Sequence, residues 1–216
     1  MNPADPAWLD RLAHDLRGPL APLQTASYLL QREDLEPERR QELLTMLERQ
    51  TRRLARMLDE LDDWSRAGRS RLLGEREECE LALLLDYALV GSGIRDAKVE
   101  DDGNAAPLMG DQQRLTQLLR TLLDFAVARG GIARIALHGD GARLHLDVVA
   151  RQVATADDAA ALLAAPQREP YDDGLGLRLL LAREIARAHG GELEIETAAE
   201  GLRLRCTLPT LGQAQG

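Results

Sequence analysis

The feature that most constrains this chain is a leucine-rich pattern over its first 67 residues, interrupted once. Leucines recur at steps of three, four or seven between positions 9 and 30, and again between positions 43 and 61. Such steps place side chains on one face of a helix. Pro37 follows the interruption and suits the first turn of a new helix. The pattern predicts two helices, at roughly 8–32 and 37–67, joined as an antiparallel hairpin.

A hairpin of two helices cannot enclose a core, because each helix meets only one partner. The second helix also carries apolar residues beside its main stripe, namely Leu44, Met46, Met57 and Trp64. A symmetric dimer that forms a four-helix bundle would cover these residues, and we expect a homodimer. The alternative is that the hairpin packs on the second part of the same chain.

The second part of the chain mixes helices with strands. The sequence predicts helices at 81–90, 112–128 and 175–189, and strands at 132–138, 143–149, 192–197 and 202–208. The strands pair around short glycine-containing turns, as β-hairpins do. We expect an α+β fold with helices on one face of a mostly antiparallel sheet. The predicted domains are a helical hairpin at 1–70 and this sandwich at 75–212.

Composition excludes several classes of function. Acidic residues outnumber basic ones by 36 to 27, a net charge of −9 that argues against nucleic acid as a partner. Cys79 and Cys206 stand far apart without a nearby Cys or His, so neither a metal site nor a disulfide framework is predicted.

The sequence has no segment near the about 20 apolar residues that span a bilayer. Residues 1–10 lack the apolar stretch of a signal peptide. We therefore expect a soluble, cytoplasmic protein without membrane contact. The initial Met and the polar tail at 212–216 suit a complete chain.

His14 is the most informative single residue. At 100° per residue it points about 170° away from the leucine face of the first helix, so we expect it in water. Asp15 can orient its ring, and Gly18, one turn further on, leaves space above it. A neutral imidazole with this access can act as a nucleophile toward a phosphoryl group. Taken alone, His14 is better explained as an ordinary surface histidine.

The residues around His14 decide between these interpretations. The segment His14-Asp-Leu-Arg-Gly-Pro-Leu20 resembles the H-box of sensor histidine kinases, whose common form is His-Glu/Asp-Leu-Arg-x-Pro-Leu. The resemblance implies that His14 is the phospho-accepting residue and Asp15 its acid/base neighbour. It also implies a dimerisation and phosphotransfer hairpin. Arg17 is then a candidate contact to phosphate or to receiver carboxylates.

The second part resembles the ATP-binding domain of the same family. Residues 110–126 are similar to the stretch that leads into the N-box helix, Asp173-Gly-Leu-Gly-Leu177 to the G2 box, and 185–196 to the helix, double glycine and strand that follow. The implied architecture is a Bergerat-type α/β two-layer sandwich.

The residues that would bind ATP are missing. The two Asn of the family's N-box fall on Thr121 and Phe125, and its usual Lys falls on Ala128. Ala150 stands where the G1 box presents an adenine-binding Asp. Phe offers no oxygen to Mg²⁺, and Ala accepts no side-chain hydrogen bond. Gly174 and Gly176 remain, either as an anion cradle or as a tight connection between elements. A carboxylate could enter the pocket from Asp157, Asp158, Asp172 or Asp173.

These observations predict a histidine phosphotransferase of a phosphorelay, with ATP binding lost. Phosphoryl groups would pass through His14 to and from Asp residues of response-regulator receiver domains, which would supply Mg²⁺, so no tightly bound cofactor is expected. A hybrid histidine kinase is a further possible partner. An active ATP-dependent histidine kinase and a non-catalytic pseudokinase adaptor are the alternatives. Phosphatase activity is disfavoured, because the family's phosphatases carry Thr or Asn where this chain has Gly18.

Charged residues of the second helix predict a solvated face with pairs at i,i+4, and part of that face could select the receiver. They are Glu38, Arg39, Arg40, Glu42, Glu48, Arg49, Arg52, Arg53 and Arg56.

Overall fold

The computed structural model describes residues 6–32, 34–95 and 97–211. Within them the chain forms two compact units. The hairpin unit comprises residues up to Asp62 together with Gln167–Gly176, and the sandwich unit comprises Asp63–Pro166 and the residues from Leu177 onward. No helix in the described ranges is long and apolar enough to cross a membrane.

The hairpin unit is built on two long helices, α1 (Pro6–Leu30) and α2 (Pro37–Ala67), of which α2 continues into the sandwich unit. Pro19 and Pro22 lie inside α1. Both helices were predicted, and α1 ends two residues before its expected boundary. The buried apolar residues of the two helices include Ala26 of α1 and Leu43 and Met57 of α2.

The sandwich unit holds the remaining elements. Its helices are α3 (Leu81–Gly91), α4 (Gln112–Ala128), α5 (Ala156–Leu162) and α6 (Arg178–Ala188). Its strands are β1 (Glu77–Cys79), β2 (Val99–Asp101), β3 (Leu108–Gly110), β4 (Ile132–Gly139), β5 (Arg143–Ala150), β6 (Glu192–Ala198) and β7 (Gly201–Pro209).

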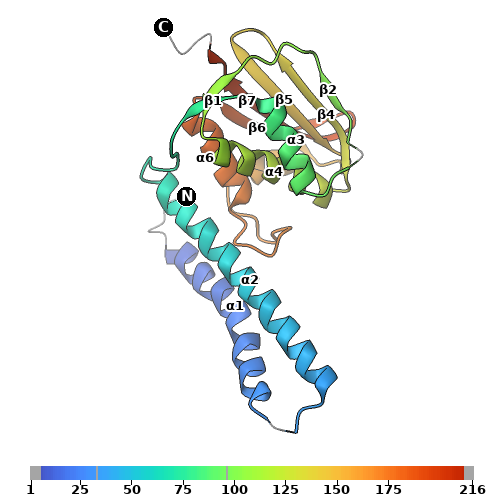
Figure 1. Ribbon diagram of the computed structural model, residues 1–216. Helices are drawn as coiled ribbons and strands as arrows, with labels where there is room; N and C mark the ends of the chain where they lie inside the picture. Colours follow the sequence, from blue (N-terminus) through green and yellow to red (C-terminus); the bar gives the residue numbers. More distant parts are fainter. Residues whose placement is uncertain (1–5, 33, 96, 212–216) are drawn as a thin grey trace. The chain divides into compact units, whose positions relative to one another are not determined.

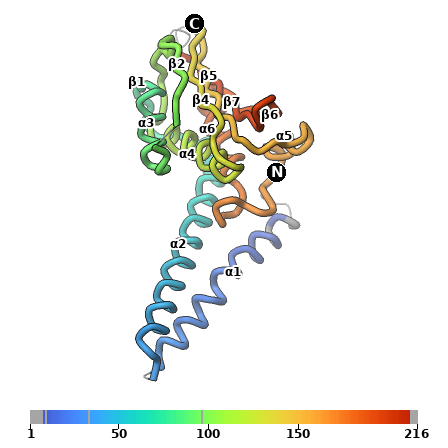
Figure 2. Tube along the Cα trace, turned by 90° about the vertical axis from the view of Figure 1, so that its right-hand side faces the viewer, coloured from blue at the N-terminus to red at the C-terminus, as the bar shows by residue number. Residues whose placement is uncertain are grey.

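A five-stranded sheet in the order β2-β4-β5-β7-β6 forms one layer of the sandwich. All its neighbours are antiparallel except β2 and β4, which run parallel, and β1 pairs with β3 in a separate ribbon. Helices α3, α4 and α6 cover one face of the sheet (Figures 1 and 2). The expected α+β two-layer sandwich is confirmed.

The core of the sandwich lies between α4, α6 and the sheet. Alternate residues of β7 point into it, with Leu202, Leu204, Cys206 and Leu208 all buried, as the period of two in a half-covered strand requires. Cys79 and Cys206 are both free thiols and both buried. Complete burial raises the pKa of the Cys206 thiol to about 12.

Three differences from the sequence-based expectation concern short or capped elements. Helix α6 begins at Arg178 rather than near residue 175, because Asp173 and Gly176 have positive φ and keep the preceding residues in a loop. The three-residue strands β1, β2 and β3 were not predicted. Helix α5, which begins with a capping box between Thr155 and Asp158, was not predicted either.

Candidate functional site

His14 lies on the exposed side of α1, where 88% of its side chain is accessible to solvent. Its exposure, predicted from the helical phase, is confirmed. The Nδ1 atom lies 3.3 Å from Oδ1 of Asp15. With the ring proton on Nδ1, the imidazole donates to this carboxylate and keeps a lone pair on Nε2. An exposed Nε2 lone pair is the group that a phosphoryl acceptor needs.

Arg11 holds Asp15 from the other side, and sequence reasoning missed it. Its Nε atom lies 3.5 Å from Oδ2 of Asp15. The i,i+4 spacing of the two residues is the one sequence feature that could have predicted this ion pair. Arg11 also donates a hydrogen bond of 2.5 Å to the carbonyl oxygen of Gln167. A chain of polar contacts therefore runs from the 167–176 segment through Arg11 and Asp15 to His14.

The turn that follows His14 leaves room for an incoming group. Gly18 is exposed, and a Cβ atom added to it would meet no heavy atom within 4 Å. Arg17 is exposed, so its guanidinium is available for an anionic partner. Pro19 is buried and belongs to the interior side of α1. The structure thus exposes His14, Arg17 and Gly18 within about one turn of α1, and places Asp15, which is 30% exposed, beside His14.

The two positions of α4 at which the resemblance predicts nucleotide-binding residues are both buried. Phe125 is completely buried, with the guanidinium of Arg129 5.2 Å from its ring centroid. Thr121 is buried too, and its hydroxyl donates to the carbonyl oxygen of Gln117. Ala128, the position of the expected Lys, is exposed. Neither buried position presents an oxygen to solvent for a metal ion.

Ala150, at the expected adenine-binding position, is fully buried as the last residue of β5. It pairs with Leu202 of β7, and a Cβ atom added to Gly201 would lie only 1.9 Å from its carbonyl oxygen. The chain beyond Ala150 is also held, since Arg151 N donates to Gly131 O and Gln152 N to Arg129 O, both at 2.9 Å. The backbone of residues 150–152 is therefore hydrogen-bonded to, or packed against, neighbouring strands and turns.

The glycines of the G2-like segment belong to the hairpin unit, where they permit close packing. The carboxylate of Glu60, a buried residue of α2, accepts a hydrogen bond of 3.1 Å from the backbone N–H of Leu175. A Cβ atom added to Gly174 would lie 1.9 Å from Oε1 of the same side chain. The Glu60 carboxylate therefore accepts the hydrogen bond of the Leu175 N–H, which could otherwise bind an external anion.

Two further contacts fix this segment. Arg53 of α2 donates 2.9 Å to the carbonyl oxygen of Asp173. Gly176 has φ of +76°, and a Cβ atom there would lie 2.4 Å from the carbonyl oxygen of Gln167. These contacts favour the second interpretation of the retained glycines, a tight connection between elements. Sequence reasoning missed Glu60, and it placed Arg53 on the solvated face of the second helix without its contact to Asp173. Nothing in α2 distinguishes either residue from its other charged residues.

The four carboxylates that were candidates for the nucleotide pocket are either exposed or engaged in local hydrogen bonds. Asp158 caps α5 together with Thr155, and Asp157 and Asp173 are exposed. Asp172 Oδ1 accepts from the backbone N–H of Gly174 at 3.2 Å. In the described ranges no group of three or more His, Cys, Asp or Glu residues is arranged to hold a metal ion.

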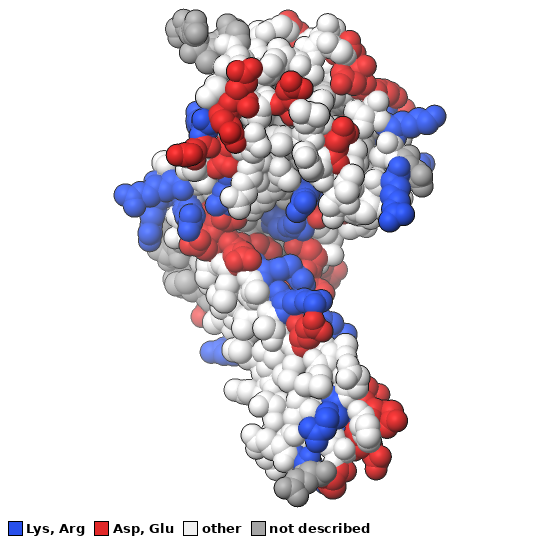
Figure 3. Space-filling view, viewed as in Figure 1, with Lys and Arg blue, Asp and Glu red and all other residues white. Residues whose placement is uncertain are grey.

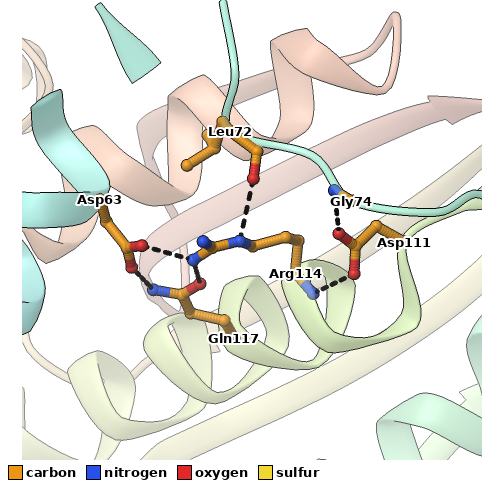
Figure 4. Close-up of polar contacts among 6 residues, drawn as sticks. All are labelled: Asp63, Leu72, Gly74, Asp111, Arg114 and Gln117. Atoms are coloured by element: carbon orange, nitrogen blue, oxygen red, sulfur yellow. Dashed lines mark hydrogen bonds and ion pairs between the residues drawn. The ribbon is translucent and has the colours of Figure 1, made fainter. Parts of the chain in front are cut away.

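A polar network holds the start of α4 to the end of α2 and the linker that follows (Figure 4). Arg114 reaches Oδ1 of Asp63 at 2.7 Å and the carbonyl oxygen of Leu72 at 3.0 Å. Asp111 accepts from the backbone N–H groups of Gly74 and of Arg114, which makes it the N-cap of α4. These residues belong to the stretch that resembles the lead into the family's N-box helix. Here Asp111 and Arg114 hold α4 against Asp63, Leu72 and Gly74.

His189 completes this network from α6. Its Nε2 accepts 3.0 Å from the backbone N–H of Asp111, and its Nδ1 lies 2.8 Å from the carbonyl oxygen of Ile185. Burial lowers the pKa of the His189 imidazole, because the charged form loses its hydration. A neutral ring that donates from Nδ1 and accepts at Nε2 satisfies both contacts.

Comparison with known proteins agrees with this geometry. Residues 7–70 match the His Kinase A (phospho-acceptor) domain. The chain is 31% identical over 210 residues to the sensor histidine kinase GtrS of Pseudomonas aeruginosa, covering 93% of this chain and 41% of that protein. The chain is therefore similar, over 93% of its length, to part of a sensor histidine kinase.

Solved structures of histidine kinases share the fold of this chain. The Acinetobacter baumannii histidine kinase AdeS aligns with a TM-score of 0.72 at 17% identity, covering 92% of this chain and 98% of that one. Histidine kinase ThkA, solved in complex with the response regulator protein TrrA, aligns with a TM-score of 0.74 at 20% identity. The alignment covers 97% of this chain and 63% of the ThkA chain. The chain spans less than half the length of curated relatives such as GtrS.

Proposed function

We propose that this histidine kinase core works as a histidine phosphotransferase of a phosphorelay. His14 would take a phosphoryl group from the phospho-Asp of one response-regulator receiver domain and pass it to the Asp of another. The observation that carries the proposal is a contrast within the chain. The side chain of His14 is 88% exposed, whereas Thr121, Phe125 and Ala150, at the positions that should bind Mg²⁺–ATP, are buried and carry neither a carboxylate nor an amide.

The chemical step fits the His14 geometry. The Nε2 lone pair attacks phosphorus, an N–P bond forms, and the P–O bond to the donor's aspartyl group breaks, which releases its carboxylate. Asp15 accepts the hydrogen bond from Nδ1–H and stabilises the positive charge that develops on the ring. Mg²⁺ in the receiver would neutralise the phosphoryl oxygens. Transfer to the second Asp is the same displacement in reverse.

The experiment that tests this proposal offers His14 two donors in parallel. One is radiolabelled ATP with Mg²⁺, and the other is a receiver domain already phosphorylated on Asp. We expect label from the receiver and none from ATP. A His14→Gln variant should accept none. Asn104→Gln, a polar change at an exposed position of the sandwich unit, is the matched control and should accept label normally.

An ATP-dependent histidine kinase is the second candidate, favoured by the kinase relatives and by the complete H-box. Label from ATP that disappears in His14→Gln would establish it and overturn the proposal. If neither donor labels the chain while several receivers bind it, the pseudokinase adaptor would replace both. A homodimer of the hairpin remains part of the proposal.

A further inference from the structure

A pocket of about 590 Å³ opens at the edge of the sandwich unit where β2 meets the start of β4. Its charged lining consists of Arg95, Lys98, Glu100, Arg134 and Arg151. Apolar side chains from the ends of α3 and α4, such as Ile94 and Val127, complete the wall. The pocket involves none of the residues around His14 and none of the buried positions Thr121, Phe125 and Ala150.

The backbone brings these cations together from three separate segments. Lys98 directly precedes β2, and Arg134 lies in β4, one residue before the paired positions Val99 and Ile135. Arg151 is held at the pocket by the hydrogen bond from its backbone N–H to Gly131 O. Arg95 lies four residues beyond the end of α3 and also lines the pocket. The cluster is therefore fixed by strand pairing and turns.

The charges of the pocket are only partly balanced. Arg134 lies 3.6 Å from Glu100 and 3.3 Å from Glu200. Among the residues with described positions, no carboxylate lies within 4.0 Å of the cationic groups of Arg95, Lys98 or Arg151. In Figure 3, basic side chains lie at the right-hand edge of the sandwich, where Figure 1 shows β2 and β4, and others lie at its left-hand edge, while acidic side chains are spread over the face between them.

We propose that this pocket binds a small phosphorylated molecule that has an apolar or ring portion, such as a nucleoside triphosphate. Arg95, Lys98 and Arg151 would bind the phosphate oxygens through charge-assisted hydrogen bonds. Ile94, Val127 and Ile132 would contact the remainder of the ligand. The net charge of −9 opposes a long polyanion such as nucleic acid and favours a small one that the pocket can enclose.

Lys98 is the only lysine in the sequence, which gives the first test. Pyridoxal 5′-phosphate carries an aldehyde and a phosphate; the lysine amine and the aldehyde form an imine with loss of water, and borohydride reduces the imine to a stable amine. We expect peptide mapping to find the label on Lys98, and millimolar ATP to protect it severalfold. Labelling of Lys98 that ATP leaves unchanged would contradict the proposal.

Calorimetry with ATP and with pyrophosphate, in 150 mM salt as a screening condition, gives the second test. We expect ATP to bind more tightly than pyrophosphate, because only ATP uses the apolar wall. The Arg95→Glu/Arg151→Glu double variant should weaken ATP binding at least tenfold. The matched control Arg143→Glu changes an exposed arginine outside the pocket lining and should bind normally.

Unchanged ATP affinity in the double variant would place the nucleotide elsewhere and overturn the proposal. An equal loss of ATP affinity in Arg143→Glu would mean that the effect is a general charge attraction, and it would also overturn the proposal. His14→Gln should bind ATP as the unmodified chain does, so this result stays separate from the phosphotransfer experiment. Circular dichroism of each variant confirms that it is folded.

Discussion

The hairpin unit and the sandwich unit bury their apolar residues to very different degrees. In the described part of the hairpin, complete burial of a large apolar side chain is confined to Leu43 and Met57, while Leu20, Tyr28, Leu44 and Leu58 are at least 40% exposed. The sandwich buries whole faces of α4, α6 and β7. The difference indicates that the sandwich is stable through its own core, whereas the hairpin has apolar surface left for a partner.

The largest expected effect tests the closed core of the sandwich. Phe125→Asn restores the residue type that the family resemblance places there, but it removes a fully buried ring and introduces an amide. We expect a loss of about 3–5 kcal/mol in the free energy of unfolding, measured with urea. Val127→Asn, at a half-exposed position of the same helix, is the control, and an equal loss there would contradict this interpretation.

The next effect concerns the homodimer that would cover the hairpin. Leu58 is 51% exposed, and Leu58→Glu should weaken self-association at least tenfold, because a carboxylate would be buried in the bundle. Analytical ultracentrifugation measures it, with Arg56→Glu as a charged control at an exposed position of α2. Monomeric protein before any substitution would show that the apolar face serves another purpose.

The network at the start of α4 is expected to contribute less. Arg114→Ala leaves the carboxylate of Asp63 without its cation in a site where both side chains are 14% exposed. We expect a loss of about 1–3 kcal/mol in the free energy of unfolding. Gln113→Ala, exposed in the first turn of α4, should change it by less than about 0.5 kcal/mol. Similar losses in both variants would assign the effect to the helix and not to the ion pair.

His189 makes the sandwich sensitive to pH. Its pKa is lowered in the folded protein by burial, so below the ordinary value of about 6.5 the unfolded chain binds more protons than the folded one. The free energy of unfolding should fall as pH drops below 6.5, by at most about 1.4 kcal/mol per unit from this group. Urea titrations of the unmodified chain and of His189→Gln between pH 5 and 8 would reveal it; identical slopes would exclude His189 as the cause.

The smallest effect belongs to the hairpin. Gly18 lies inside α1 with open space around it, so Gly18→Ala should stabilise the helix by about 0.5–1 kcal/mol. Ala21→Gly, at an exposed position one turn away, should have the opposite sign. A loss of stability in Gly18→Ala would mean that another chain packs against this position.

Elements in which the hydrophobic period repeats several times could be predicted from the sequence. Both hairpin helices and the hairpins β4–β5 and β6–β7 were predictable, because many residues contribute to each period. The strands β1, β2 and β3 have three residues each, too few to show alternation. The apolar residues Leu175 and Leu177 extended the predicted α6, although positive φ at Gly176 keeps them outside the helix.

Prediction of the candidate site was limited by distance along the chain. The exposure of His14 follows from one helix and was predictable. The burial of Glu60 depends on a backbone N–H 115 residues away, and the contact of Arg11 with Gln167 spans 156 residues. The replacement of the expected N-box asparagines by Thr121 and Phe125 was visible in the sequence. The contacts of Glu60 and Arg53 with the G2-like segment became visible only in the three-dimensional structure.

The burial of both cysteines has a practical consequence for spectroscopy. Since Cys79 and Cys206 are inaccessible and the Cys206 thiol stays protonated near neutral pH, neither should react readily with thiol-directed dyes. A cysteine introduced at an exposed position such as Ser27 or Asn104 would then be the single reactive thiol. One fluorophore per chain on either unit would report separately on the hairpin and on the sandwich, without removing a native residue from the core.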